Sequence, residues 1–188
     1  MNNRLLASIF ACGFSVSAAV AETYTVDPRH TFPSFEIDHL GFSIQRGRFN
    51  QTAGKIMLAP ASASGSIDIA IDAASISTGL ADLEKHLRSD EFLDVARFPK
   101  IVFKSKQLIF DKAQLIGADG ELTLHGVTQP VHLSVDRFHC GVNLISRKHV
   151  CGANATATLK RSDFGVDKYA PVLADDLKVM IQIEAIKD

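Results

Sequence analysis

The chain has 188 residues, of which 20 are Lys or Arg and 21 are Asp or Glu, and its formal net charge is −1. This balance argues against a nucleic-acid partner, which usually requires a basic face. Hydrophobic residues make up 46% of the sequence, with 12 Phe and no Trp. Because Phe adds aromatic bulk without a polar group, this composition favours a dry protein interior.

The first residues have the pattern of an export signal. Arg4 precedes an apolar run over residues 5–16, and Ala19-Val20-Ala21 supplies the small residues of a cleavage site. The run is too short for a membrane-spanning helix, which needs about 20 apolar residues. We therefore predict a cleaved signal peptide over residues 1–21 and a single domain over residues 22–188, with an N-terminal anchor helix as the alternative.

Alternating apolar residues predict strands along most of the remaining chain. The clearest pattern lies in residues 66–72, where Ile67, Ile69 and Ile71 share one face, and a similar alternation over residues 177–184 ends the chain. Further strands are predicted for residues 34–40, 46–58 (one long strand or a bent pair), 101–110, 113–118, 120–125, 131–138 and 152–160. About eight or nine strands at regular spacing indicate an all-β sandwich or barrel.

One segment departs from this alternation. Leu80, Leu83 and Leu87 recur at the spacing of one helical face. Thr78 is a residue type that caps helix N-termini. We predict one short helix within residues 78–94, packed over one end or side of the sheet.

Two cysteines remain after signal cleavage. Cys140 and Cys151 flank a segment with the composition of a hairpin tip, between two predicted strands. Export places both thiols in an oxidising compartment, so we predict a disulfide between them. Two reactive thiols or a metal-binding pair are the alternatives.

Residue patterns for catalysis or for cofactor and metal binding do not emerge. The seven histidines lack the paired spacing of a zinc protease, and the sequence contains neither a Gly-x-Ser-x-Gly elbow nor a Gly-rich phosphate loop. We therefore predict no enzymatic activity, no metal and no cofactor. Arg161 and Arg88 have two interpretations each: a structural ion pair at a chain corner or helix end, or a contact with a ligand head group at a pocket mouth.

Several short motifs follow one another along the chain. They are Asp27-Pro28-Arg29-His30-Thr31, His39-Leu40-Gly41, His86-Leu87-Arg88-Ser89, Leu122-Thr123-Leu124-His125-Gly126-Val127-Thr128 and Arg161-Ser162-Asp163-Phe164-Gly165. In this order they resemble the YceI-like family over residues 23–186. The resemblance implies an extended, antiparallel, lipocalin-like barrel of about eight strands with a helix, in an exported periplasmic protein.

The resemblance also implies a ligand. Members of the family hold polyisoprenoid chains, such as isoprenoid quinones or polyprenyl phosphates, in a long tunnel. The expected apolar contacts are Phe35, Ile37, His39, Phe42, Phe49, Leu87, Phe92, Phe98, Phe103 and Phe164, with Arg88 and Arg161 as possible head-group contacts.

The expected partners are a long-chain isoprenoid lipid or quinone and, transiently, a membrane or a membrane redox protein. The chain is expected to be a monomer or homodimer. A fatty acid or fatty amide in the same tunnel, or a filled barrel acting as a stress or interaction protein, remain alternatives, because a barrel of about eight strands can either fill its interior or hold one ligand.

Overall fold

The computed structural model describes residues 21–188, so the predicted signal peptide, apart from Ala21, lies outside the described residues. The described chain forms eleven strands and one short α-helix. The strands are β1 (Glu22–Val26), β2 (Phe32–His39), β3 (Ser43–Phe49), β4 (Thr52–Ala59), β5 (Ser64–Asp72), β6 (Ile76–Ser77), β7 (Lys100–Asp111), β8 (Gln114–Leu124), β9 (Val127–Val142), β10 (His149–Lys160) and β11 (Asp176–Lys187), and the helix is α1 (Ala81–Arg88). Over the described range, no helix has the length and apolar character to cross a membrane.

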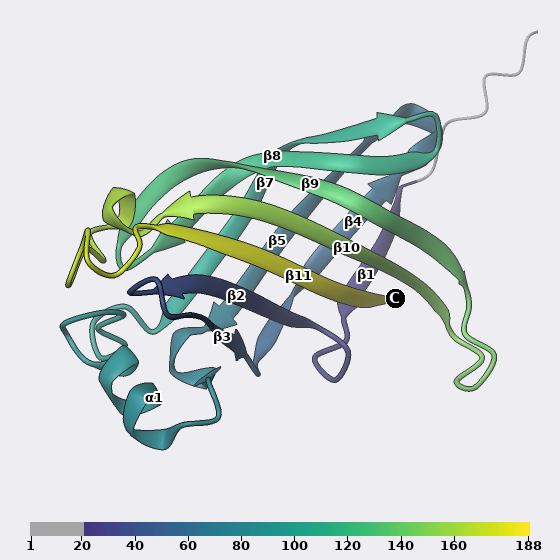
Figure 1. Cartoon of the computed structure of the whole chain (residues 1–188). Helices are drawn as coiled ribbons and strands as arrows, with labels where there is room; N and C mark the ends of the chain where they lie inside the picture. The colour runs from purple at the N-terminus through teal and green to yellow at the C-terminus, as the bar shows by residue number, and fades with distance from the viewer. Residues whose placement is uncertain (1–20) are drawn as a thin grey trace, which may run out of the picture.

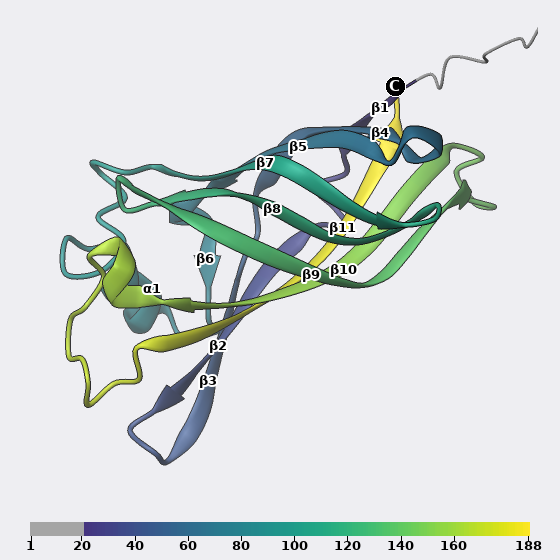
Figure 2. The same cartoon turned by 90° about the horizontal axis from the view of Figure 1, so that it is seen from above.

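Eight antiparallel strands close into a barrel, in the order β1-β4-β5-β7-β8-β9-β10-β11, with β11 pairing back to β1. The predicted all-β barrel with a short helix is confirmed. Three further strands, β2, β3 and β6, extend the sheet from the edge of β11. They splay away from the barrel axis at the end where α1 lies (Figures 1 and 2).

A tight turn between β1 and β2 makes this extension possible, because it lets both strands pair with the same edge of β11. The first half of β11 pairs with β2 and its last residues pair with β1. Between β1 and β2, the buried Asp27 accepts hydrogen bonds from the backbone N–H of Arg29 at 3.1 Å and from its guanidinium at 3.0 Å. The hydrogen bond from Arg29 holds the pKa of Asp27 well below its usual range. The fully buried Thr31 completes the turn by bonding to the backbone of Glu184 on β11. The sequence motif at residues 27–31 therefore has a structural role.

One strand prediction is wrong, and one open alternative is decided. Residues 113–118 and 120–125 belong to one continuous strand, β8, because Gly120 does not turn the chain. It lets the backbone pass under the ring of Phe103, where a Cβ atom would lie 2.6 Å from the ring Cζ. For residues 46–58 the alternative of a pair is confirmed, because they belong to two strands, β3 and β4, with a break at Asn50 and Gln51.

The helix lies inside the predicted segment but is shorter, and Thr78 is not its N-cap. Leu80 occupies that position without a side-chain hydrogen bond. Glu84 instead ties the preceding segment to the helix, since its carboxylate accepts the backbone N–H groups of Thr78 at 2.8 Å and Gly79 at 3.2 Å. The bond from Thr78 is the main cause that lowers the pKa of Glu84.

The predicted disulfide is confirmed. Cys140 on β9 and Cys151 on β10 lie directly opposite each other in the antiparallel register, and their sulfur atoms are bonded. The bond fastens the two strands at the base of a hairpin that projects at the end of the barrel opposite α1 (Figure 1).

Candidate functional site

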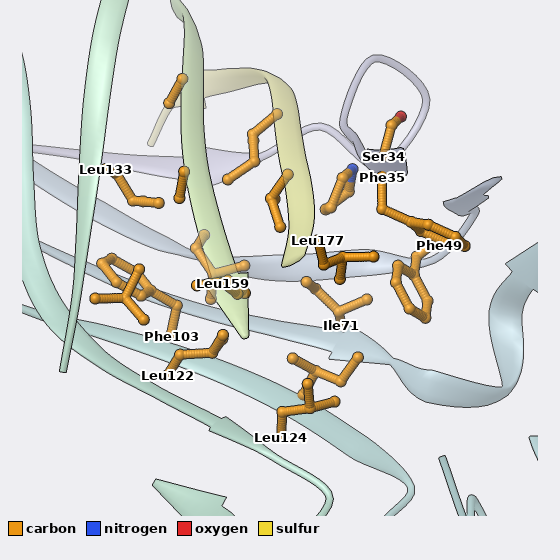
Figure 3. Close-up of a pocket in the computed structure, with 18 of the residues that line it drawn as sticks. Ser34, Phe35, Phe49, Ile71, Phe103, Leu122, Leu124, Leu133, Leu159 and Leu177 are labelled. Carbon is orange, nitrogen blue, oxygen red and sulfur yellow. The ribbon is translucent and has the colours of Figure 1, made fainter. Parts of the chain in front are cut away.

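The inward faces of the barrel strands enclose a cavity of about 580 Å³ that runs along the barrel. Ile67, Ile69 and Ile71 line it from β5, and the alternating apolar residues of β11 line the opposite wall. Side chains from several strands, including Phe103, Leu122 and Leu159, reach into the same space (Figure 3). The barrel is therefore hollow, and the alternative of a filled barrel is wrong.

Strand β10 explains part of this space. Its inward positions carry Ala153, Ala155 and Ala157, all of which line the cavity. The sequence shows this stretch as one face of small side chains, and the structure places that face inside. Because methyl side chains reach only a short way into the barrel, the opposite wall lacks partners to pack against, and a void remains.

The two ends of the cavity differ in packing. At the end away from α1, the lining residues Tyr24, Leu58 and Ala185 are buried to 3% exposure or less. Burial, followed by the hydrogen bond to Glu22, raises the pKa of Tyr24 to about 12. At the α1 end, the lining residues Leu80 and Tyr169 are 58% and 53% exposed. The cavity is therefore closed at one end and opens beside α1.

Polar side chains gather near the open end. Ser34, His39, Gln45 and Arg46 line the cavity from the splayed strands β2 and β3, and Thr78 lines it from the segment before α1. Among the residues that the structure describes, the closed end has one polar lining group, the Tyr24 hydroxyl, which donates to Glu22 at 2.6 Å. The cavity wall thus changes from apolar to mixed along its length.

A bridge of charged groups, here called the mouth latch, joins α1 to the loop after the 3-10 helix Arg161–Phe164. The Glu91 carboxylate lies 2.6 Å from Lys168 Nζ and 2.7 Å from His86 Nε2. The hydrogen bond from Lys168, followed by that from His86, lowers the pKa of Glu91. Tyr169, next to the latch, packs beside the rings of His86 and Phe92. The latch therefore holds two segments that border the opening.

Most of the predicted apolar contacts border the cavity. Eight line it, namely Phe35, Ile37, His39, Phe49, Leu87, Phe92, Phe103 and Phe164. Their contact with a ligand stays a prediction.

Phe42 and Phe98 do not line the cavity, and these two assignments are corrected. Phe42 is 89% exposed, because it follows the left-handed residues Leu40 and Gly41 in the turn between β2 and β3. Phe98 lies before β7 begins and packs edge-on against His125 in the β8–β9 turn.

Both arginines make structural contacts, and a contact of either with a ligand head group stays a prediction. Arg88 donates to the backbone carbonyls of Ala74 and Ile76, each at 2.8 Å, and so fastens α1 to β6. It does not border the cavity.

Arg161 lines the cavity wall but is only 6% exposed, and burial lowers its pKa. Its guanidinium donates to four backbone carbonyls of the following loop, those of Val166, Lys168, Leu173 and Ala174. With its donors engaged in this way, Arg161 fixes the loop that carries the mouth latch.

Prediction by residue type missed many lining residues. Choosing phenylalanines left out the aliphatic side chains of β5, β8, β9 and β11, although the alternation that predicts those strands also identifies their inward positions. Tyr169 carries no such signal, because it lies in an irregular loop with a left-handed backbone. Within residues 21–188, no three His, Cys, Asp or Glu side chains are grouped so that they could hold a metal ion.

Comparison with known proteins identifies the family. A family model described as the YceI-like domain matches residues 24–185. The chain belongs to the YceI-like family. The protein YceI of Salmonella agona is 32% identical and matches 100% of this chain and 99% of its own length.

Solved structures of related domains share the fold. The Campylobacter jejuni YCEI protein superposes with a TM-score of 0.68 at 27% identity, covering 81% of this chain and 90% of its own. A polyisoprenoid binding domain from Saccharophagus degradans, described as implicated in plant cell wall breakdown, superposes with a TM-score of 0.60 at 18% identity and covers 88% and 98%. The latter likeness concerns the fold alone. The YceI-like domain described here thus shares its barrel architecture with both solved structures.

Proposed function

We propose that this protein is a non-catalytic carrier that holds one long isoprenoid-type chain, an isoprenoid quinone or a polyprenyl phosphate, inside the barrel. The observation that carries the proposal is the continuous apolar cavity of about 580 Å³, closed at one end and open at the other. Cavities of roughly 300–1,000 Å³ with mostly apolar walls are typical of small-molecule sites. The polyisoprenoid binding domain of Saccharophagus degradans, with the same fold, supports the choice of ligand class.

The binding energy would come from removing the chain from water. Enclosing several hundred Å² of apolar surface at about 25 cal/mol per Å² contributes roughly 10 kcal/mol before the costs of association. Such binding depends little on the detailed structure of the tail. Selectivity would arise at the open end, where the polar lining side chains can contact a head group.

The proposal includes a cellular role. An exported protein with this cavity would move, store or sequester the lipid in the periplasm. The exposed side chains of Leu80 and Tyr169 at the opening would contact a membrane or a membrane redox protein briefly during exchange. Neither role requires a chemical step or a cofactor, and either a monomer or a homodimer could perform it.

The test is to identify what the protein carries when it is purified from its own host. Native mass spectrometry followed by organic extraction should yield a stoichiometric isoprenoid. A fatty acid or fatty amide in its place would leave the carrier function intact but replace the ligand class. An empty cavity in protein from its native host would contradict the proposal.

A matched pair of variants connects the ligand to the cavity. Ala155→Phe places a ring in the void from the inward face of β10, so the bound lipid should be lost while the fold is retained. Thr158→Phe adds the same ring to the exposed face of the same strand and should leave lipid content unchanged. Ala157→Phe offers a second inward position if the first variant does not fold. Equal lipid content in inward and outward variants would disprove binding in the cavity.

A further inference from the structure

The hairpin between β9 and β10 presents two aliphatic side chains to solvent at its tip. Leu144 is 90% exposed and Ile145 is 96% exposed, the highest values among the large hydrophobic residues of the described chain. The hairpin lies at the closed end of the barrel, away from the cavity opening (Figure 1). The ligand site therefore does not explain this exposure.

The tip is an ordered turn. The Asn143 side chain accepts the backbone N–H groups of Ile145 at 3.0 Å and Ser146 at 2.9 Å. The backbone N–H of Asn143 donates to the Lys148 carbonyl at 2.8 Å, and the disulfide closes the base of the hairpin. The local structure thus holds Leu144 and Ile145 outward, although exposing them to water is unfavourable.

The chain on both sides of this tip carries charge of a single sign. Residues 137–162 contain no Asp or Glu, while Arg147 and Lys148 follow the aliphatic pair directly, and Arg137 lies on the adjoining strand. Within residues 21–188, none of these three cations takes part in an ion pair. In contrast, the cations Lys104 and Lys106 on β7 are paired with acidic side chains.

We propose that the β9–β10 hairpin docks the protein on an anionic phospholipid bilayer. Leu144 and Ile145 enter the interface between head groups and acyl chains, and Arg147 and Lys148 contact the lipid phosphates. Aliphatic tips flanked by basic residues bind such surfaces because apolar burial and attraction to anionic lipids act together. The charge complementarity favours an anionic bilayer over a second copy of this chain, since the same basic segments would repel each other across a symmetric contact.

Docking through the hairpin leaves the α1 end and its opening away from that bilayer, free to exchange a ligand with a second membrane or a membrane redox protein. This inference does not depend on the ligand class, because the hairpin shares no described contact with the cavity opening. A failure of docking would therefore leave the carrier function untouched.

The experiment is vesicle flotation with full-length processed protein and an intact disulfide. Phosphatidylcholine vesicles containing phosphatidylglycerol should bind the wild type, and vesicles of phosphatidylcholine alone should bind it far less. The double variant Arg147→Gln/Lys148→Gln should bind about 25-fold less, since each cation near an anionic surface contributes about fivefold. Leu144→Ser/Ile145→Ser should lose about tenfold by removing the inserted apolar surface.

Two controls separate the hairpin from general charge and hydrophobicity. Lys104→Gln/Lys106→Gln removes the same charge from the barrel wall, and Ile116→Ser removes an exposed aliphatic side chain from the outer face of β8. Both should bind like the wild type. An equal loss of vesicle binding in a control, or no preference for anionic vesicles, would overturn the proposal. So would a dimer, seen by light scattering, that dissociates in Leu144→Ser/Ile145→Ser.

Discussion

At the scale of single residues, close approaches of backbone and side chain set the shape of the barrel wall. Gly120 on β8 is the clearest case, because a Cβ atom there would lie 2.5 Å from the Lys104 carbonyl oxygen and 2.6 Å from Phe103 Cζ. The carbonyl belongs to the paired strand and cannot move without breaking the sheet. The ring in turn forms part of the cavity wall.

We expect Gly120→Ala to lower the free energy of unfolding by about 1–3 kcal/mol, the usual cost of overpacking. Chemical denaturation measures this directly. Gly152→Ala on β10 is the matched control, because its Cβ would lie at an ordinary 3.6 Å from Glu184 Cγ. A Gly120→Ala protein as stable as the control would show that the wall yields at this point.

Some residues of the site could be placed from the sequence, and others could not. Inward positions follow from alternation, so Phe35 and Phe103 could be placed from the sequence. Phe42 and Phe98 were misplaced because residue type does not distinguish an aromatic side chain in a strand from one in a turn. Arg161 required coordinates, since its backbone acceptors come from a loop whose path no local pattern defines.

At the scale of elements, the strands could be predicted better than their connections. In the sequence, Gly120 suggests a turn, yet β8 continues through it. A glycine can mark either a turn or a close approach of another group to the backbone, and the sequence alone does not distinguish the two. The splayed strands β2 and β3 carry ordinary alternation. That alternation does not indicate that one edge of β11 pairs first with β2 and then with β1, because this depends on pairing between distant segments.

The mouth latch is the element that should control ligand exchange. Glu91→Gln removes the charge that holds Lys168 and weakens the link between α1 and the loop after Arg161. Release of a dansyl-tagged prenyl chain should become about two- to fivefold faster, as expected for loss of a surface ion pair. Stopped-flow fluorescence measures the rate. Glu121→Gln breaks the comparable pair with Lys106 on the barrel wall and should leave release unchanged.

Acid should have the same effect on the wild type. The pKa of Glu91 is lowered in the folded protein, so the latch is present above its usual value and is lost as pH falls through the lowered one. Wild-type release should therefore approach the variant's rate only when the pH falls below the usual pKa of a glutamate side chain. An unchanged rate in Glu91→Gln at neutral pH would mean that another element limits exchange.

At the scale of the whole molecule, the two ends of the barrel differ both in the cavity and on the surface. The cavity runs from a tightly packed end at Tyr24 to a mixed, exposed end at Leu80 and Tyr169. On the surface, the basic side chains of the hairpin, which form no ion pairs within residues 21–188, lie at the closed end. The ion pairs of the mouth latch lie at the open end. A ligand with an apolar tail and a polar head should therefore enter tail first, because the head group keeps its polar contacts only at the opening.

The absence of Trp from the chain allows a direct test of this orientation. Leu80→Trp places a fluorophore at the opening, and Tyr24→Trp places one at the closed end. A prenyl chain carrying a nitroxide on its head group should quench the first variant strongly and the second weakly, because nitroxide quenching requires close approach. The unlabelled chain should bind both variants equally, which controls for loss of affinity. Stronger quenching at position 24 would reverse the orientation, and equal quenching would mean that the cavity does not order its ligand along the barrel axis.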